Sequence, residues 1–255
     1  MKIKHETITY RDELNDEFAF DSITPRKIGK DYVYVYKSLF KKFTRFFWYR
    51  LVAFPPAKIY LVLSQHHKIV NKHLIARNAR KTGCFIYGNH THNMNDALIP
   101  TMVSFPKSVH NISMPVLGRI TPSLGAIPLP DDRESTKNFM DCIDYRIKEK
   151  KCLCIYPEAH IWPYYTKIRP FTSLSFRYPV QYNVPSFCFV NTYQKRRFSK
   201  MPKVVTYVEG PFWPDTSLSP KEQREDLRNR IYETMCRLAE HSNVELIKYV
   251  KATPE

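Results

Sequence analysis

Residues 84–99 read CFIYGNHTHNMNDALI, and this stretch decides the fold. Its first four residues are apolar and predict a short buried strand, which Gly88 and Asn89 end. The apolar triplet after Asp96 predicts the start of a helix. The polar residues between the strand and the helix therefore lie at a strand end, where reactive groups have a rigid base and an open side.

His90 and Asp96 are the candidate reactive pair in this stretch. Histidine takes a proton near neutral pH, and a carboxylate beside it fixes its tautomer and stabilises its cation. Side chains that face each other on one helix are three or four residues apart. The two residues can therefore meet only if a loop runs into a helix between them. The alternative is an ordinary polar loop that carries His90 and His92 without chemistry.

Composition narrows the class of protein. The chain has 255 residues, enough for one large α/β domain, and its six glycines offer no glycine-rich nucleotide loop. Its 40 Lys and Arg against 24 Asp and Glu give a formal charge of +16, which favours nucleic acid, anionic lipid or an acidic substrate as partner. The six cysteines lack metal-type or disulfide spacing, so we expect them reduced and mostly buried. The first residues contain no apolar signal-peptide core, and we expect a cytoplasmic protein.

Residues 1–78 are predicted to form an irregular arm, up to residue 26, and then a basic, aromatic helical hairpin. Aromatic and aliphatic residues recur at helical spacing from Tyr32 to Phe54, with Lys41, Lys42 and Arg45 among the basic residues between them. Pro55-Pro56 predicts the end of the first helix. Neither helix has the roughly 20 apolar residues of a membrane span. Aromatic and basic residues together favour a helix in the membrane interface; the alternative is a basic hairpin packed on the domain.

Residues 79–255 are predicted to form the main domain. Strands are expected at 109–114, 151–156, 184–190 and 203–208, and helices at 134–150 and, with or without a break, at 219–250. Alternation of strands and helices predicts an α/β fold with a single mixed sheet flanked by helices.

Four separated blocks of the sequence resemble the glycerolipid acyltransferase family, which includes the 1-acylglycerol-3-phosphate acyltransferases. That family carries Asn-His, four residues and then Asp, and here five residues separate Asn89-His90 from Asp96. A second family block is Gly-x-Ile leading to Asp-Arg, and here residues 125–127 lead to Asp132-Arg133.

The remaining two blocks lie further along the chain. The family's Phe-Pro-Glu-Gly-Thr-Arg is matched by Tyr156-Pro157-Glu158, but Ala159-His160-Ile161 replaces Gly-Thr-Arg, and Pro170-Phe171 follows downstream. A late apolar strand with a proline is matched weakly by Val184-Pro185. All four blocks fall between residues 84 and 190 in the order that the family has them.

The resemblance implies transfer of a fatty acyl group from an acyl thioester, carried by coenzyme A or acyl carrier protein, to the hydroxyl of a lysophospholipid. The acceptor that it implies first is 1-acylglycerol-3-phosphate, in phospholipid synthesis. His90 would be the general base and Asp96 would orient it, with no covalent intermediate, no metal and no cofactor beyond the co-substrate. The substrate-binding residues that it implies, some of them replacing the missing Gly-Thr-Arg, are Asn89, Arg133, Glu158, Lys167 and Arg169.

The implied setting is the inner face of the cell membrane, with the protein bound peripherally to an anionic surface. Two other functions remain open. A metal-dependent hydrolase would use His90, His92 and Asp96, with Glu158 and His160, as zinc ligands. A nucleic-acid binder rests on charge alone, and because the sequence has no binding signature we expect no nucleic-acid partner.

Overall fold

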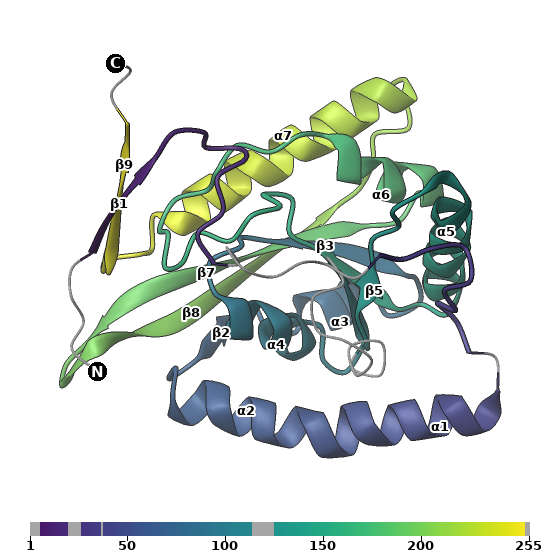
Figure 1. The fold of residues 1–255 in the computed structure, drawn as a ribbon, viewed down its shortest axis with the longest axis horizontal. Helices are drawn as coiled ribbons and strands as arrows, with labels where there is room; N and C mark the ends of the chain where they lie inside the picture. Colours follow the sequence, from purple (N-terminus) through teal and green to yellow (C-terminus); the bar gives the residue numbers. More distant parts are fainter. Residues whose placement is uncertain (1–5, 20–26, 37, 114–124, 253–255) are drawn as a thin grey trace.

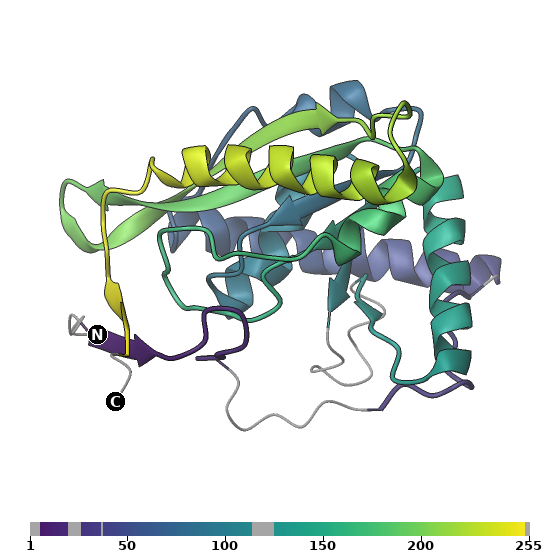
Figure 2. The same ribbon diagram turned by 90° about the horizontal axis from the view of Figure 1, so that it is seen from above.

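The computed structural model describes residues 6–19, 27–36, 38–113 and 125–252. Its main body has three layers, with a central sheet and helices on both faces, and α7 (Pro220–Ala239) lies across one face (Figures 1 and 2). The α/β fold with a mixed sheet flanked by helices is confirmed.

The central sheet has seven strands in the order β2-β8-β7-β3-β6-β4-β5. Strands β7, β3, β6, β4 and β5 run parallel, β8 is antiparallel to β7, and β2 is parallel to β8. The bounds are β2 Lys68–Val70, β3 Cys84–Gly88, β4 Val109–Ser113, β5 Ile127–Pro128, β6 Cys152–Ile155, β7 Ser186–Arg196 and β8 Ser199–Phe212. Strands were predicted in the β4, β6, β7 and β8 regions; Met114, the last residue expected in the first of these, lies outside the described residues.

The two faces of the sheet form two cores, because successive side chains of a strand point to opposite faces. Phe85 and Tyr87 of β3 pack in the core that includes α5 (Arg133–Lys148), α6 (Arg177–Tyr182) and α7. Cys84 and Ile86 pack in the opposite core with α2 (Phe54–Leu63), α3 (Leu74–Asn78) and α4 (Asn93–Ser104). β3 is buried on both faces, which explains its continuous apolar run. A short 3₁₀ turn, η2 (Leu174–Phe176), precedes α6.

The predicted helical hairpin is wrong. α1 (Leu39–Phe47), the π-helix η1 (Trp48–Ala53) and α2 follow one another as one continuous helical run along one side of the molecule (Figure 1). Pro55-Pro56 does not end this run, because the two prolines occupy the first turn of α2, where a missing N–H matters least. The N–H of Phe54 donates to the carbonyl of Tyr49, five residues back, and this wider turn absorbs the prolines.

The outer side of the helical run is apolar and exposed. Its exposed large side chains are Leu39, Phe40, Phe43, Phe46, Phe47, Trp48, Leu51, Val52, Ile59, Val62 and Leu63. The side chains of Lys41, Lys42 and Arg45 lie outside the described part of the chain. Leu61, by contrast, is buried in the core beside α3 and α4, so α2 is packed on the domain. Within the described ranges, no helix combines the length and apolar character needed to cross a membrane.

The chain ends form a small sheet of their own. β1 (Glu6–Tyr10) pairs in parallel with β9 (Ile247–Lys251), so the expectations of an irregular arm through residue 10 and of a closing helix to residue 250 are both wrong. The closing helix α7 ends at Ala239. The predicted domain boundary at residue 78 lies between β2 and β3, and these two strands belong to the same sheet. All six cysteines are free and five are buried, as expected.

Candidate active site

The loop after β3 lies at the carboxyl end of a central strand, between β6 and β7. Gly88 is the last residue of β3. No side chain fits at this position, because a Cβ would lie 2.2 Å from the ring of Phe189 on the neighbouring strand. After the loop, α4 begins at Asn93, with His92 as its extended N-cap residue. The predicted junction of loop and helix between His90 and Asp96 is present.

The junction brings the candidate pair together. Asp96 Oδ2 lies 2.8 Å from Nδ1 of His90 and also accepts the backbone N–H groups of Thr91 and His92, at 2.8 and 2.9 Å. A carboxylate only accepts, so Nδ1 carries the proton and Nε2 keeps its lone pair. No partner of Nε2 occurs among the described residues, and the His90 side chain is 18% exposed while Asp96 is 2% exposed. The geometry is that of an oriented base with one nitrogen open.

The residue just after β6 packs against the face of the His90 ring. Tyr156 stacks on the imidazole, with ring centroids 4.4 Å apart and an interplanar angle of 15°. Its hydroxyl donates to the backbone carbonyl of Asp96. The loop itself is fixed by the segment after Tyr156, since the N–H groups of Trp162 and Tyr164 donate to the carbonyls of His90 and Thr91.

A buried polar chain supports Asp96 from behind. Asn191 of β7 donates from Nδ2 to Asp96 Oδ1 over 3.3 Å, and its Oδ1 accepts from the hydroxyl of Thr206, 2.7 Å away. Thr206 in turn lies 2.8 Å from Nε2 of His67, whose pKa burial lowers to about 4. Asn89 is locked to the same strand, because it donates to the carbonyl of Asn191 and accepts the N–H of Asn191. Fully partnered buried groups of this kind hold a site rigid.

Glu158 and Arg169 form a second buried pair beside the loop. Arg169 is fully buried, and one guanidinium nitrogen lies 3.4 Å from Glu158 Oε2, which also accepts the N–H of His90. Burial raises the pKa of Glu158 to about 7, although Arg169 and the N–H of His90 act to lower it. Arg169 also donates to the carbonyls of Glu13, Glu158 and His160 and packs over Trp162. It ties the loop after β6 to the N-terminal segment.

No hydrogen bond, ion pair or ring contact joins Arg133, Lys167 or His160 to His90 in the described part of the chain. Arg133 is exposed at the first position of α5, after the N-cap residue Asp132, and Lys167 is also exposed. Neither makes a hydrogen bond or ion pair with another residue in the described part of the chain. His160 faces Glu17, 3.4 Å away.

The metal-dependent hydrolase has no support. Among the described residues, no three His, Cys, Asp or Glu side chains are placed to hold one metal ion. His92 is instead the N-cap residue of α4, and its Nδ1 accepts the backbone N–H of Asn95.

Sequence reasoning missed three functional partners, Asn191, Thr206 and His67. Asn191 follows a run of five apolar or small residues on a buried strand, and a polar residue in such a place signals a buried hydrogen bond. Thr206 and His67 gave no comparable signal, because the contacts of Thr206 with Asn191 and of His67 with Thr206 depend on the register of β7, β8 and β2.

Comparisons with known proteins agree with this fold. No protein-family model matches the sequence, and a search of curated proteins finds no match. Among solved structures, the chain is similar to the crystal structure of the 1-acyl-sn-glycerophosphate (LPA) acyltransferase PlsC from Thermotoga maritima. The TM-score is 0.50 at 16% sequence identity, and the alignment covers 71% of this chain and 76% of that one. The similarity confirms that this chain has the acyltransferase fold to which its four sequence blocks pointed.

Proposed function

We propose that the chain is an acyltransferase that moves a fatty acyl group from an acyl thioester to the hydroxyl of a lysophospholipid, with 1-acylglycerol-3-phosphate as the first acceptor to test. One observation carries the proposal: His90 is oriented through Nδ1 by buried Asp96, and its Nε2 has no partner in the described part of the chain. The similarity of fold to PlsC supports the same class of reaction.

The reaction needs one proton to move from the acceptor hydroxyl to His90 and from His90 to the leaving thiolate. Nε2 of His90 takes the proton from the acceptor hydroxyl as its oxygen attacks the thioester carbonyl. The C–S bond then breaks, and the leaving thiolate receives the proton from the imidazolium. Asp96 stabilises the imidazolium between these two steps, and such general-base help contributes about 10²–10⁴-fold.

The predicted substrate-binding residues divide into two groups in this proposal. Exposed Arg133 and Lys167 are proposed to meet the acceptor phosphate, because cationic side chains at the surface are open to a ligand. Asn89, Glu158 and Arg169 are buried and are proposed to hold the acceptor site in place.

The apolar helical run supports a place for the enzyme at a membrane. Phe40 and Phe43 are 73% and 65% exposed on α1, and exposed aromatic groups with basic residues nearby suit a helix that lies in the lipid interface. We propose peripheral binding to the anionic inner face of the cell membrane, where the lysophospholipid resides. The charge of +16 also suits an acidic donor, acyl-CoA or acyl carrier protein.

A product assay tests this proposal. Purified protein would receive oleoyl-CoA or oleoyl-acyl carrier protein with 1-acylglycerol-3-phosphate, lysophosphatidylglycerol or lysophosphatidylcholine, and diacyl products would be measured by mass spectrometry. We expect a diacyl product with at least one phosphate-bearing acceptor. Thioester hydrolysis to free fatty acid, without any diacyl product, would contradict acyl transfer.

A further inference from the structure

A cavity lies at the opposite end of the parallel strands from His90. It has a volume of about 480 Å³, a size that suits a small ligand. Its lining includes Ser108 and Val109 at the amino end of β4 and Lys151 just before β6, whereas Tyr156, which stacks on His90, lies just after β6. At about 3.3 Å per residue, the extended chain from Lys151 to Tyr156 puts roughly 16 Å between these two residues.

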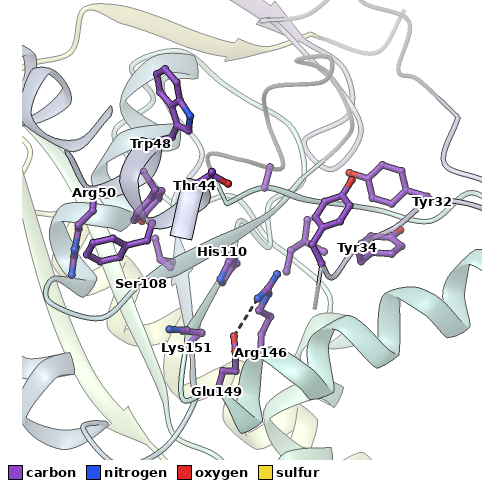
Figure 3. A pocket seen from close by; sticks show the side chains of 16 residues that line it. Tyr32, Tyr34, Thr44, Trp48, Arg50, Ser108, His110, Arg146, Glu149 and Lys151 are labelled. Atoms are coloured by element: carbon purple, nitrogen blue, oxygen red, sulfur yellow. Dashed lines mark hydrogen bonds and ion pairs between the residues drawn. The ribbon is translucent and has the colours of Figure 1, made fainter. Parts of the chain in front are cut away.

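The cavity is lined by an excess of positive charge. Arg50, Arg146 and Lys151 face one acidic residue, Glu149, among the described lining residues. Figure 3 shows Arg146 and Lys151 projecting beside His110, with Arg50 on the side of the helical run. An anion is therefore the ligand class that the lining favours.

Among the described residues that line the cavity, Arg146 is the first of two whose guanidinium group has a nitrogen without a partner. It is 6% exposed, and one terminal nitrogen lies 3.3 Å from Glu149 Oε2. Its Nε is buried without a hydrogen-bond partner in the part of the chain that the structure describes. A buried charged N–H without an acceptor is unfavourable, so an anion in the cavity would stabilise the charge of this guanidinium group.

Arg50 is the second such group and comes from η1. Its guanidinium packs over the ring of Phe105, 4.6 Å from the centroid, and one nitrogen donates to the carbonyl of Pro106. The other terminal nitrogen is buried and lacks a partner within the described ranges. Two guanidinium groups from separate elements thus line one cavity, and planar guanidinium groups match the oxygens of phosphate.

The aromatic residues that line the cavity favour a lipid as the source of the phosphate. Phe46 and Trp48 line the cavity and are also exposed on the helical run proposed to meet the membrane. Tyr32 and Tyr34 pack edge to face on the other side, with ring centroids 4.7 Å apart (Figure 3). Aromatic rings around a cationic floor suit a headgroup whose phosphate enters the cavity while its glycerol and chains stay at the rim.

We propose that this cavity binds the phosphate headgroup of an anionic phospholipid, as a second lipid site that is separate from the acyl-transfer site and seats the helical run on the membrane. The lipid source of the phosphate rests on the membrane contact in the proposed function. Recognition of phosphate by Arg50 and Arg146 does not rest on acyl transfer.

Titration with a water-soluble lipid tests the proposal. Dihexanoyl-phosphatidylglycerol, kept below its critical micelle concentration, would be titrated into the full chain by calorimetry, so that diffuse attraction to a charged surface plays no part. We expect saturable binding that Arg146→Gln and Arg50→Gln each weaken at least tenfold. Lys58→Gln is the matched control, because Lys58 is exposed on α2 and does not line the cavity; we expect its affinity within twofold of the unmodified chain.

Further measurements separate a lipid site from a site for free phosphate and from the acyl-transfer site. Inorganic phosphate at the same concentrations is expected to bind at least tenfold more weakly, and equal affinity would overturn the lipid assignment. Absence of lipid binding, or full affinity in both arginine variants, would overturn the site. Circular dichroism checks folding, and Arg50→Gln keeps the test decisive if buried Arg146 proves essential for folding. His90→Ala is expected to lose acyl transfer and keep lipid affinity, so failure of the proposed reaction would leave this measurement intact.

Discussion

Asp96 holds His90 across a loop that turns into a helix, with Oδ2 2.8 Å from Nδ1. The same oxygen accepts two backbone N–H groups of the loop, so the carboxylate fixes both the imidazole and the backbone that carries it. The five residues between the pair do not separate it, because the loop turns into α4 at Asn93 and the two side chains meet.

Replacing Asp96 by Asn should lower kcat more than it changes KM. The amide keeps an oxygen for the two backbone N–H groups but loses the charge that stabilises the His90 imidazolium, so we expect kcat to fall about 10²–10⁴-fold. Steady-state kinetics with 1-acylglycerol-3-phosphate would measure both constants. A kcat within threefold of the unmodified chain would show that Asp96 does not assist the base.

Glu158 should make the chain less stable as the pH rises. Its pKa is raised from 4.5 to about 7 in the folded state, so the folded chain binds this proton more tightly than the unfolded chain does. The stabilisation is present below pH 4.5 and is lost as the pH rises through about 7. Between pH 5 and 8 the loss is about 2–3 kcal/mol.

Urea unfolding at pH 5 and pH 8 measures this effect as a difference between variants. The glutamine of Glu158→Gln cannot titrate. The free energy of unfolding of this variant should therefore fall between pH 5 and pH 8 by about 2–3 kcal/mol less than that of the unmodified chain. Arg169, left without its partner, lowers the stability of the variant at both pH values. Glu225→Gln, an exposed change on α7, should keep the original pH dependence. Identical pH dependence in all three proteins would refute the raised pKa.

Gly88→Ala should destabilise the fold at the base of the catalytic loop. The added Cβ would lie 2.2 Å from the ring of Phe189, and both residues belong to paired central strands that leave no room to shift. Overpacking of this kind costs about 1–3 kcal/mol. Gly29→Ala is the control, because nothing lies within 4 Å of a Cβ there. Equal midpoints of urea unfolding for the two variants would contradict the close packing.

The double substitution Phe40→Asp, Phe43→Asp should release the protein from membranes without unfolding it. Both rings are exposed, so they contribute little to the fold, and burying each in lipid contributes about 1.5–3 kcal/mol. We expect cosedimentation with phosphatidylglycerol vesicles to fall at least tenfold. Phe198→Asp, at another exposed ring, is the control and should bind as the unmodified chain does. Full vesicle binding by the double variant would remove the helical run from the proposed interface.

The centre of the site was predictable because its parts are close in sequence. β3, the loop and the start of α4 follow from one apolar run, a glycine and a second apolar run. His90 and Asp96 were therefore placed correctly relative to each other. The support from Asn191 was not predictable, since it lies 95 residues from Asp96 and reaches it only because β7 pairs with β3 in one register.

The helical hairpin failed for a different physical reason. Two adjacent prolines normally end a helix because they lack N–H donors. Here a π turn of six residues, Trp48–Ala53, restarts the helix so that Pro55 and Pro56 fall in the first turn of α2. That outcome depends on the packing of Leu61 and its neighbours against α4, which no local pattern reveals.

Thiol release by the purified protein tests the role of His90 most directly. Oleoyl-CoA and 1-acylglycerol-3-phosphate would be supplied with EDTA present throughout, and free thiol would be measured with and without acceptor for the unmodified chain, His90→Ala and His73→Ala. His73 is an exposed histidine outside the site and serves as the control. We predict acceptor-dependent release that persists in EDTA, stays unchanged in His73→Ala and falls at least a hundredfold in His90→Ala. Release that survives in His90→Ala would show that His90 is not the base and would contradict the central claim.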